Sequence, residues 1–106
     1  RTHRKIAVID GRIGFTGGVN ISDTQSERAS ASAFHDLHLK LGGDVVRALQ
    51  LAFAEDWHYA AGRKLTDPRY WPAQPPGPIR CQLIPSGPDN PLAPIHRVHV
   101  EALHNA

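Results

Sequence analysis

The sequence contains a single cysteine, Cys81, no methionine and few aromatic residues (7%). One cysteine excludes an internal disulfide framework, and with it the class of small secreted scaffolds that disulfides hold together. No apolar run approaches the roughly 20 residues that span a bilayer, and no signal peptide is recognisable. Twelve basic residues against ten acidic ones give a formal net charge of +2. This balance does not by itself indicate nucleic-acid binding.

Proline is absent from most of the chain, because all nine prolines lie between Pro68 and Pro94. Proline lacks a backbone N–H and clashes inside a helix, so this stretch cannot hold long regular elements. One strand from Ile79 to Ile84 still fits, and we interpret residues 67–94 as a connector. A helical pattern resumes near Ile95. With 106 residues there is room for one small domain, and we expect this domain to be a fragment of a longer protein.

A β-hairpin is predicted at the start of the chain. Lys5 to Ile9 is apolar and β-branched, Asp10-Gly11 is a turn signal, and a second short strand begins at Ile13. Gly17-Gly18 interrupts that strand, and Val19 to Ser22 is expected to form a short helical turn. A polar loop follows.

One further strand and one helix are expected after this loop. Polar and apolar residues alternate from Asp36 to Leu41, which is typical of a strand with one buried side. Gly42-Gly43 then forms a turn. The apolar stripe from Asp44 to Ala61 predicts a helix with Asp44 as its N-cap and Gly62 as its stop.

The residues that carry chemistry lie in and just after the hairpin. His3, Lys5 and Asp10 form the pattern H-x-K-x4-D, and the residues that follow at fixed spacing are Gly17, Gly18 and Asn20. At average residue usage, the chance of this pattern in a chain of this size is about one in a million or less. It is therefore a far stronger signal than a glycine-rich loop alone.

These residue types suit a phosphodiester. Alternate residues of a strand share a face, so His3 and Lys5 should project together. A neutral imidazole can attack phosphorus, while the ammonium group neutralises the phosphate oxygens. The Asn20 amide and the backbone N–H groups near Gly17 and Gly18 would complete an anion cradle.

Three carboxylates are candidates for the two remaining roles, support of the turn and orientation of the His3 imidazole. Asp10 belongs to the catalytic pattern, but its even position directs it away from His3, so a supporting role in the turn is favoured. A histidine nucleophile needs a carboxylate on its other ring nitrogen. Asp36 is the candidate for this orienting role, and Asp23 is the alternative.

The pattern resembles the HKD motif of the phospholipase D superfamily, H-x-K-x4-D-x6-G-[GS]-x-N. Four segments also resemble bacterial cardiolipin synthases in order and spacing, namely His3-Arg-Lys-Ile-Ala-Val-Ile-Asp-Gly, Gly14-Phe-Thr-Gly-Gly-Val-Asn-Ile, Phe53-Ala-Glu-Asp-Trp and Pro85-Ser-Gly-Pro-Asp. Proteins of this family combine two HKD motifs, and this sequence has one. The stretch His38-Leu39-Lys40, followed by Asp44, has the wrong spacing and no glycine sequel.

The resemblance implies an α/β fold: a partial phospholipase D-type α-β-α sandwich with a mixed β-sheet and packed helices. Residues 1–66 would be the C-terminal part of an HKD lobe. Residues 67–94 would be the proline-rich connector with one strand, and residues 95–106 would start a helix of the following lobe.

The activity implied by the resemblance is phosphatidyl transfer through a phosphohistidine intermediate. The catalytic set would be His3, Lys5, Asp10, Asn20 and Asp36, with His3 as the nucleophile or the general acid. Phosphate would be bound by Lys5, Gly17, Gly18 and Asn20. No cofactor or metal is implied. The partners would be an anionic phospholipid such as phosphatidylglycerol and a second HKD motif, from a missing part of the chain or another subunit, with no nucleic acid. The location implied is the bacterial cytoplasm at the inner membrane surface.

Two other functions fit the same residues. A phosphodiesterase or nuclease of the same superfamily would share every motif residue. The single motif also fits a non-catalytic half-domain that only assembles, and we expect the isolated fragment to be inactive. His96, His99 and His104 do not complete a known ligand set, so no metal site is predicted.

Overall fold

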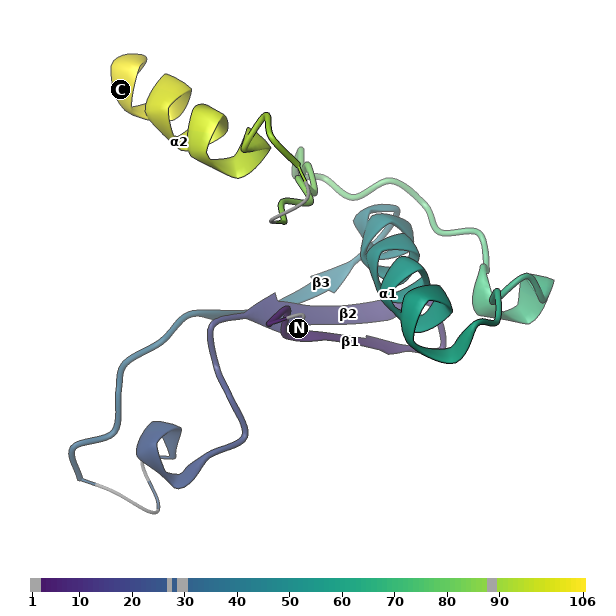
Figure 1. The fold of residues 1–106 in the computed structure, drawn as a ribbon, viewed down its shortest axis with the longest axis horizontal. Helices are drawn as coiled ribbons and strands as arrows, with labels where there is room; N and C mark the ends of the chain where they lie inside the picture. The colour runs from purple at the N-terminus through teal and green to yellow at the C-terminus, as the bar shows by residue number, and fades with distance from the viewer. Residues whose placement is uncertain (1–2, 27, 29–30, 88–89) are drawn as a thin grey trace.

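The computed structural model describes residues 3–26, 28, 31–87 and 90–106. A hairpin and a third strand form a small sheet, one helix packs on that sheet, and a second helix follows a proline-rich segment (Figure 1). In chain order the elements are β1 (Ile6–Ile9), β2 (Ile13–Gly17), the 3-10 helix η1 (Asp23–Gln25), β3 (His38–Gly42), α1 (Val45–Ala61), the 3-10 helix η2 (Pro68–Tyr70) and α2 (Pro94–His104).

The three strands form an antiparallel sheet in the order β1-β2-β3. In the central row Val8 lies opposite Gly14, which lies opposite Leu41. The hairpin turn closes with the Arg12 N–H donating to the Ile9 carbonyl at 2.9 Å. Its two central residues, Asp10 and Gly11, have φ values of 52° and 63°. Positive φ at both positions characterises the type I′ turn that Asp-Gly favours, which confirms the predicted hairpin.

Helix α1 crosses one face of this sheet and supplies the core. Val46, Leu49 and Ala52 are the buried apolar side chains among the described residues. Gly14 allows α1 to pack closely on β2, because a Cβ placed at Gly14 would lie 2.6 Å from the Leu49 Cδ1 atom. The strand residues that share a face with Gly14 therefore point toward α1, and their neighbours point to the opposite face.

The helix itself agrees with the sequence prediction. It begins at Val45 and ends at Ala61, and Gly62 follows with a φ of 66° and its N–H donating to the His58 carbonyl. Asp44 precedes the helix as expected, although its side chain makes no capping hydrogen bond. The expected helical turn lies slightly later than predicted, at Asp23–Gln25.

Two expectations about the architecture need correction. The sheet is wholly antiparallel rather than mixed, because a hairpin joins its first two strands and the following loop returns the chain antiparallel. Within the described residues α1 is the one helix that contacts the strands, so the arrangement has two layers, as a part of a sandwich would. Residues 79–84 form no strand. That segment has no strand beside it to complete a ladder, and prolines bracket it.

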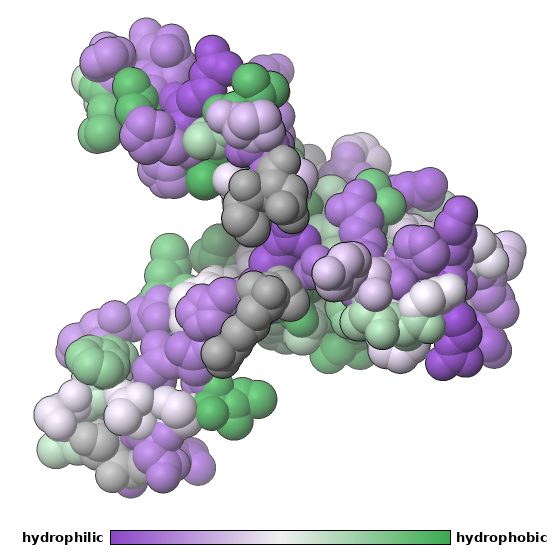
Figure 2. Space-filling view, in the orientation of Figure 1, coloured by the Kyte–Doolittle hydropathy of each residue, from purple (hydrophilic) through white to green (hydrophobic). Residues whose placement is uncertain are grey.

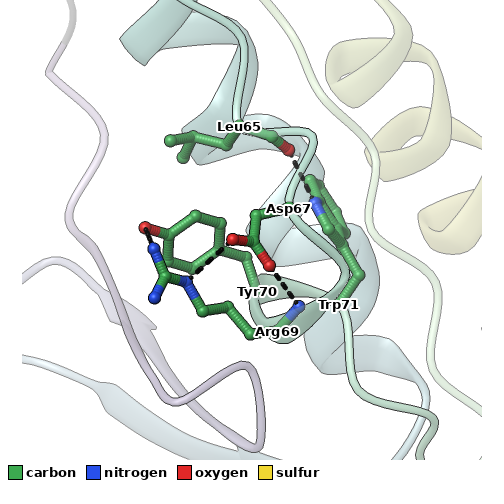
Figure 3. A network of polar contacts seen from close by, with 5 residues as sticks. All are labelled: Leu65, Asp67, Arg69, Tyr70 and Trp71. Carbon is green, nitrogen blue, oxygen red and sulfur yellow. Dashed lines mark hydrogen bonds and ion pairs between the residues drawn. The ribbon is translucent and has the colours of Figure 1, made fainter.

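The segment after α1 is fastened by local polar contacts (Figure 3). The Trp71 indole N–H donates to the Leu65 carbonyl at 2.7 Å. Asp67 accepts from the Arg69 backbone N–H and pairs with its guanidinium, both at 3.0 Å. The Gln50 side-chain amide then donates to the Tyr70 carbonyl at 3.2 Å. The segment then lies against the hairpin turn, where a Cβ on Gly11 would meet Pro72 and the Tyr70 carbonyl oxygen.

Helix α2 lies apart from the sheet (Figure 1) and contacts no other helix or strand of the described chain. Its bounds, Pro94–His104, match the helical pattern expected from about Ile95. Figure 2 shows apolar side chains among polar ones on helix α2. The exposed apolar residues of this helix include Ile95, Val98, Val100 and Leu103.

Candidate functional site

The candidate site lies where β1 begins, at the end of the sheet away from the hairpin turn. His3 and Lys5 precede the first ladder residue, Ile6. The Lys5 Nζ atom lies 2.8 Å from both ring nitrogens of His3 and donates to the His3 carbonyl at 2.9 Å. The prediction that these two side chains project together is therefore confirmed.

The contact sets a lysine ammonium group against the imidazole ring of His3. The ammonium carries donors only, whereas the role of each His3 ring nitrogen depends on the tautomer. The arrangement therefore combines a group that can act as nucleophile or proton carrier with a positive charge 2.8 Å away.

The two side chains belong to the face of the sheet that α1 leaves uncovered. Arg4, the residue between them, points to the α1 side and pairs with Asp56 of that helix. Alternation then places His3 and Lys5 on the opposite face. In the described structure no helix packs against that face, and His3 is exposed.

The glycine pair contacts Asp36 and the start of β3. A Cβ on Gly17 would lie 2.6 Å from the His38 Cα atom and close to the Leu37 carbonyl oxygen. A Cβ on Gly18 would collide with the Asp36 carboxylate, 2.7 Å from its Cγ atom. Both glycines are therefore required by the close approach of the segment that follows the loop.

This packing changes the expected anion cradle. The Gly18 N–H donates to the Leu37 carbonyl at 3.0 Å, and the Asn20 N–H donates to the Gln25 side-chain oxygen at 2.6 Å. Neither of these backbone donors is available to a phosphate. The role of Lys5 and Asn20 as phosphate ligands stays a prediction. Within the described residues the Asn20 side chain has no hydrogen-bond partner.

Asp36 is held by its own loop. Its Oδ2 atom accepts from the Gln25 amide at 2.9 Å, and its Oδ1 atom accepts from the Leu37 N–H at 2.7 Å. Within the described chain, no hydrogen bond joins Asp36 to His3. The orienting role of Asp36 thus stays a prediction, and so does the alternative at Asp23, whose side chain lines a shallow hollow with those of Asn20 and Gln25.

Asp10 lies at the opposite end of β1 from His3. Seven residues of extended chain at about 3.3 Å each put roughly 23 Å between the two. Its side chain makes no hydrogen bond to the turn in the described structure, so its contribution there is its left-handed backbone, with a φ of 52°.

Three residues near the site were missed by the sequence reasoning. Gln25 bonds both to Asp36 and to the Asn20 backbone, but a glutamine in a polar loop carries no local signal. His38 lies opposite Gly17 on β3, within the strand that was predicted by alternation. Arg4 occupies the unspecified position of the motif, so the sequence pattern assigned it no role.

The remaining histidines of the described chain do not form a metal-binding cluster. No group of three or more histidine, cysteine or acidic side chains that could hold a metal ion occurs in the described part of the chain. The His99 ring instead contacts the Ile95 carbonyl one helical turn earlier, at 2.8 Å.

Comparison with known proteins gives relatives over the whole chain. A cardiolipin synthase of Geobacillus thermodenitrificans is 40% identical over 112 residues. Cardiolipin synthases A of Pseudomonas fluorescens and Pseudomonas putida are 41% and 38% identical over 107 residues. The chain is homologous to bacterial cardiolipin synthases of the phospholipase D superfamily. Each alignment covers 100% of this chain and 22% of the relative, so the chain spans about a fifth of the length of these synthases.

No family model matches the chain, and no solved structure matches it. The helices of the described residues include none with the length and apolar character needed to cross a membrane.

Proposed function

We propose that this chain supplies one half of a phosphatidyltransferase active site. In this half His3 acts on the phosphodiester, while Lys5 and Asn20 hold its oxygens. The observation that carries the proposal is the direct contact of Lys5 Nζ with the His3 ring, at 2.8 Å, on the uncovered face of the sheet. The homology to cardiolipin synthases supports the choice of a phospholipid as substrate.

The reaction proceeds in two balanced steps. A His3 ring nitrogen attacks the phosphorus of a phosphatidylglycerol, so that an N–P bond forms and the P–O bond to glycerol breaks. The leaving glycerol takes a proton from a general acid that a second HKD motif provides. The hydroxyl of a second phosphatidylglycerol then attacks phosphorus and gives its proton to the same group of the second motif. The N–P bond breaks, so that cardiolipin forms and His3 is restored. The same geometry serves the converse assignment, in which His3 protonates the leaving group.

Lys5 changes partners during this cycle. Before substrate binds, its ammonium occupies the His3 ring and the His3 carbonyl. An arriving phosphodiester offers anionic oxygens, which are stronger acceptors than a neutral imidazole. The flexible lysine side chain moves to these oxygens and leaves the ring lone pair free for phosphorus. Asp36, fixed by Gln25 and Leu37, provides the carboxylate that orients the imidazole once the ring turns toward it.

The partners follow from the same proposal. The second HKD motif comes from another part of the protein or from another subunit, and the substrate is an anionic lipid. The reaction takes place at a bacterial membrane surface, because the substrate resides there.

A second candidate is a half-domain without activity of its own. The observation that favours it is the presence of one HKD motif in the sequence. A chain without a partner for its motif would bind a phosphodiester weakly and turn over nothing. Lipid turnover by the 106-residue chain alone, dependent on His3, would exclude this candidate.

The test of the proposed function is product analysis with the natural protein that carries this chain. Vesicles of phosphatidylglycerol labelled in the head group are supplied, and cardiolipin, phosphatidic acid and free glycerol are quantified. The proposal predicts cardiolipin and glycerol in equal amounts. Phosphatidic acid without cardiolipin would indicate a hydrolase instead. Cleavage of a nucleic-acid phosphodiester with the lipid untouched would indicate a nuclease.

A further inference from the structure

Arg4 connects the segment that precedes β1, residues 3–5, to helix α1. Its Nη1 atom donates to the Asp56 Oδ1 atom at 2.9 Å, and its Nη2 atom donates to the Ser86 carbonyl at 3.5 Å. Asp56 lies 52 residues away along the chain, in the C-terminal half of α1. Both charged side chains are 33% exposed, so the pair is partly shielded from water.

Among the described residues, His3 and Lys5 of this segment make few contacts with the rest of the fold. The ladder of β1 starts at Ile6, so residues 3–5 extend beyond the paired sheet. In the part of the chain that the structure describes, the side-chain hydrogen bonds of His3 and Lys5 connect these two residues only to each other. An unpaired strand end of this kind frays unless another contact fixes it.

Because successive residues of an extended chain point to opposite faces, the Arg4–Asp56 ion pair also fixes the directions of His3 and Lys5. Because Arg4 is drawn toward α1, the residues on either side of it must project from the opposite face. Rotation of the segment about its own axis would remove the Arg4 guanidinium from Asp56. The ion pair therefore opposes the motion that would turn His3 and Lys5 away from a substrate on the uncovered face.

We propose that the Arg4–Asp56 ion pair is a positioning contact for the phosphodiester site. It holds His3 and Lys5 at the angle needed for attack without touching the substrate itself. This inference rests on the proposed function, since it assigns the pair to that reaction. It gives roles to two residues that the sequence pattern leaves unassigned: the variable position inside the motif and an acidic residue of α1.

The kinetic experiment compares Arg4→Gln, Asp56→Ala and the double variant in the phosphatidyl transfer assay. Misplacement of a reacting group by about 1 Å costs on the order of a hundredfold in rate. Each single variant should lose about 10- to 100-fold in kcat, with KM changed less than about threefold. The double variant should be no worse than the poorer single one, because both act through one contact. Arg4→Lys, which keeps a charge for Asp56, should recover most of the loss.

The control is Asp67→Asn, which removes the more exposed ion pair with Arg69 at a site distant in sequence from the motif. Its kcat should stay within about twofold of the parent value. A structural role alone would lower the urea midpoint of Asp56→Ala and leave kcat per folded molecule unchanged. That result, or strictly additive losses in the double variant, would overturn the proposal.

A second readout does not depend on activity. Protein labelled with ¹³C at histidine Cε1 reports the order of the His3 ring by NMR, and the amide of Ile6 reports the order of the strand start. Asp56→Ala should shift the His3 signal toward its random-coil position and speed amide exchange at Ile6, while the His58 signal stays unchanged. If the parent protein transfers no lipid, the proposed function fails and this arm still decides the positioning. An unchanged His3 signal would refute the positioning contact whatever the activity.

Discussion

The Asp36 carboxylate lies directly against the α-carbon of Gly18. A Cβ at that glycine would sit 2.7 Å from the Asp36 Cγ atom and nearer still to its oxygens. The Gly18 N–H is already bonded to the Leu37 carbonyl. The second glycine of the motif therefore allows the approach of Asp36, which leaves the side chains of Lys5 and Asn20 as the phosphate ligands in our proposal.

Gly18→Ala should consequently displace Asp36 and lower the transfer rate. We expect a loss of about 10- to 100-fold in kcat, because the carboxylate and the β3 start must both shift. Steady-state kinetics with urea denaturation checks this. Gly42→Ala is the matched control, since a Cβ there meets nothing within 4 Å. Equal activity of the two alanine variants would show that Asp36 does not need this approach.

Gln25 is predicted to support both Asn20 and Asp36. Its side chain accepts from the Asn20 N–H and donates to the Asp36 carboxylate. Gln25→Ala should raise KM by about tenfold, because the loop that carries the Asn20 amide loses its tether. Gln25→Glu should be at least as impaired, because it places a carboxylate against that of Asp36. The control is Gln82→Ala, at an exposed position outside the site. A KM unchanged in both Gln25 variants would contradict the tether.

Asp10 is predicted to act on folding rather than on chemistry. Asp10→Asn should retain activity within about twofold, because asparagine tolerates the left-handed backbone at φ 52°. Asp10→Val should destabilise the protein by about 1–2 kcal/mol, the cost of that conformation for a residue with a branched Cβ. Urea unfolding and initial rates measure the two effects. If Asp10→Asn were stable but inactive, the carboxylate would have a catalytic role.

Local patterns predicted the elements that depend on neighbouring residues. The Asp10-Gly11 turn sets the hairpin, and the apolar stripe that ends at Gly62 sets α1. The contact of Lys5 with His3 followed from alternation alone. In each case the determining residues lie within one turn or one strand of each other.

The remaining features depend on contacts between distant segments. Whether Ile79 to Ile84 forms a strand depends on a partner strand, which composition does not reveal. The use of the Gly18 N–H by Leu37 and the pairing of Arg4 with Asp56 each join parts of the chain separated by a loop or more. Single-sequence patterns report local geometry, so these contacts appeared only in the folded chain.

The measurement that tests the central claim most directly is the cardiolipin-forming rate of His3→Ala in the natural protein. His35→Ala is the matched control, because it removes an exposed histidine from the loop before β3. We predict that His3→Ala loses at least about a thousandfold in rate, as removal of a reacting group does, while its urea midpoint and the rate of His35→Ala stay near the parent values. Full activity in a folded His3→Ala protein would contradict the assignment of this site.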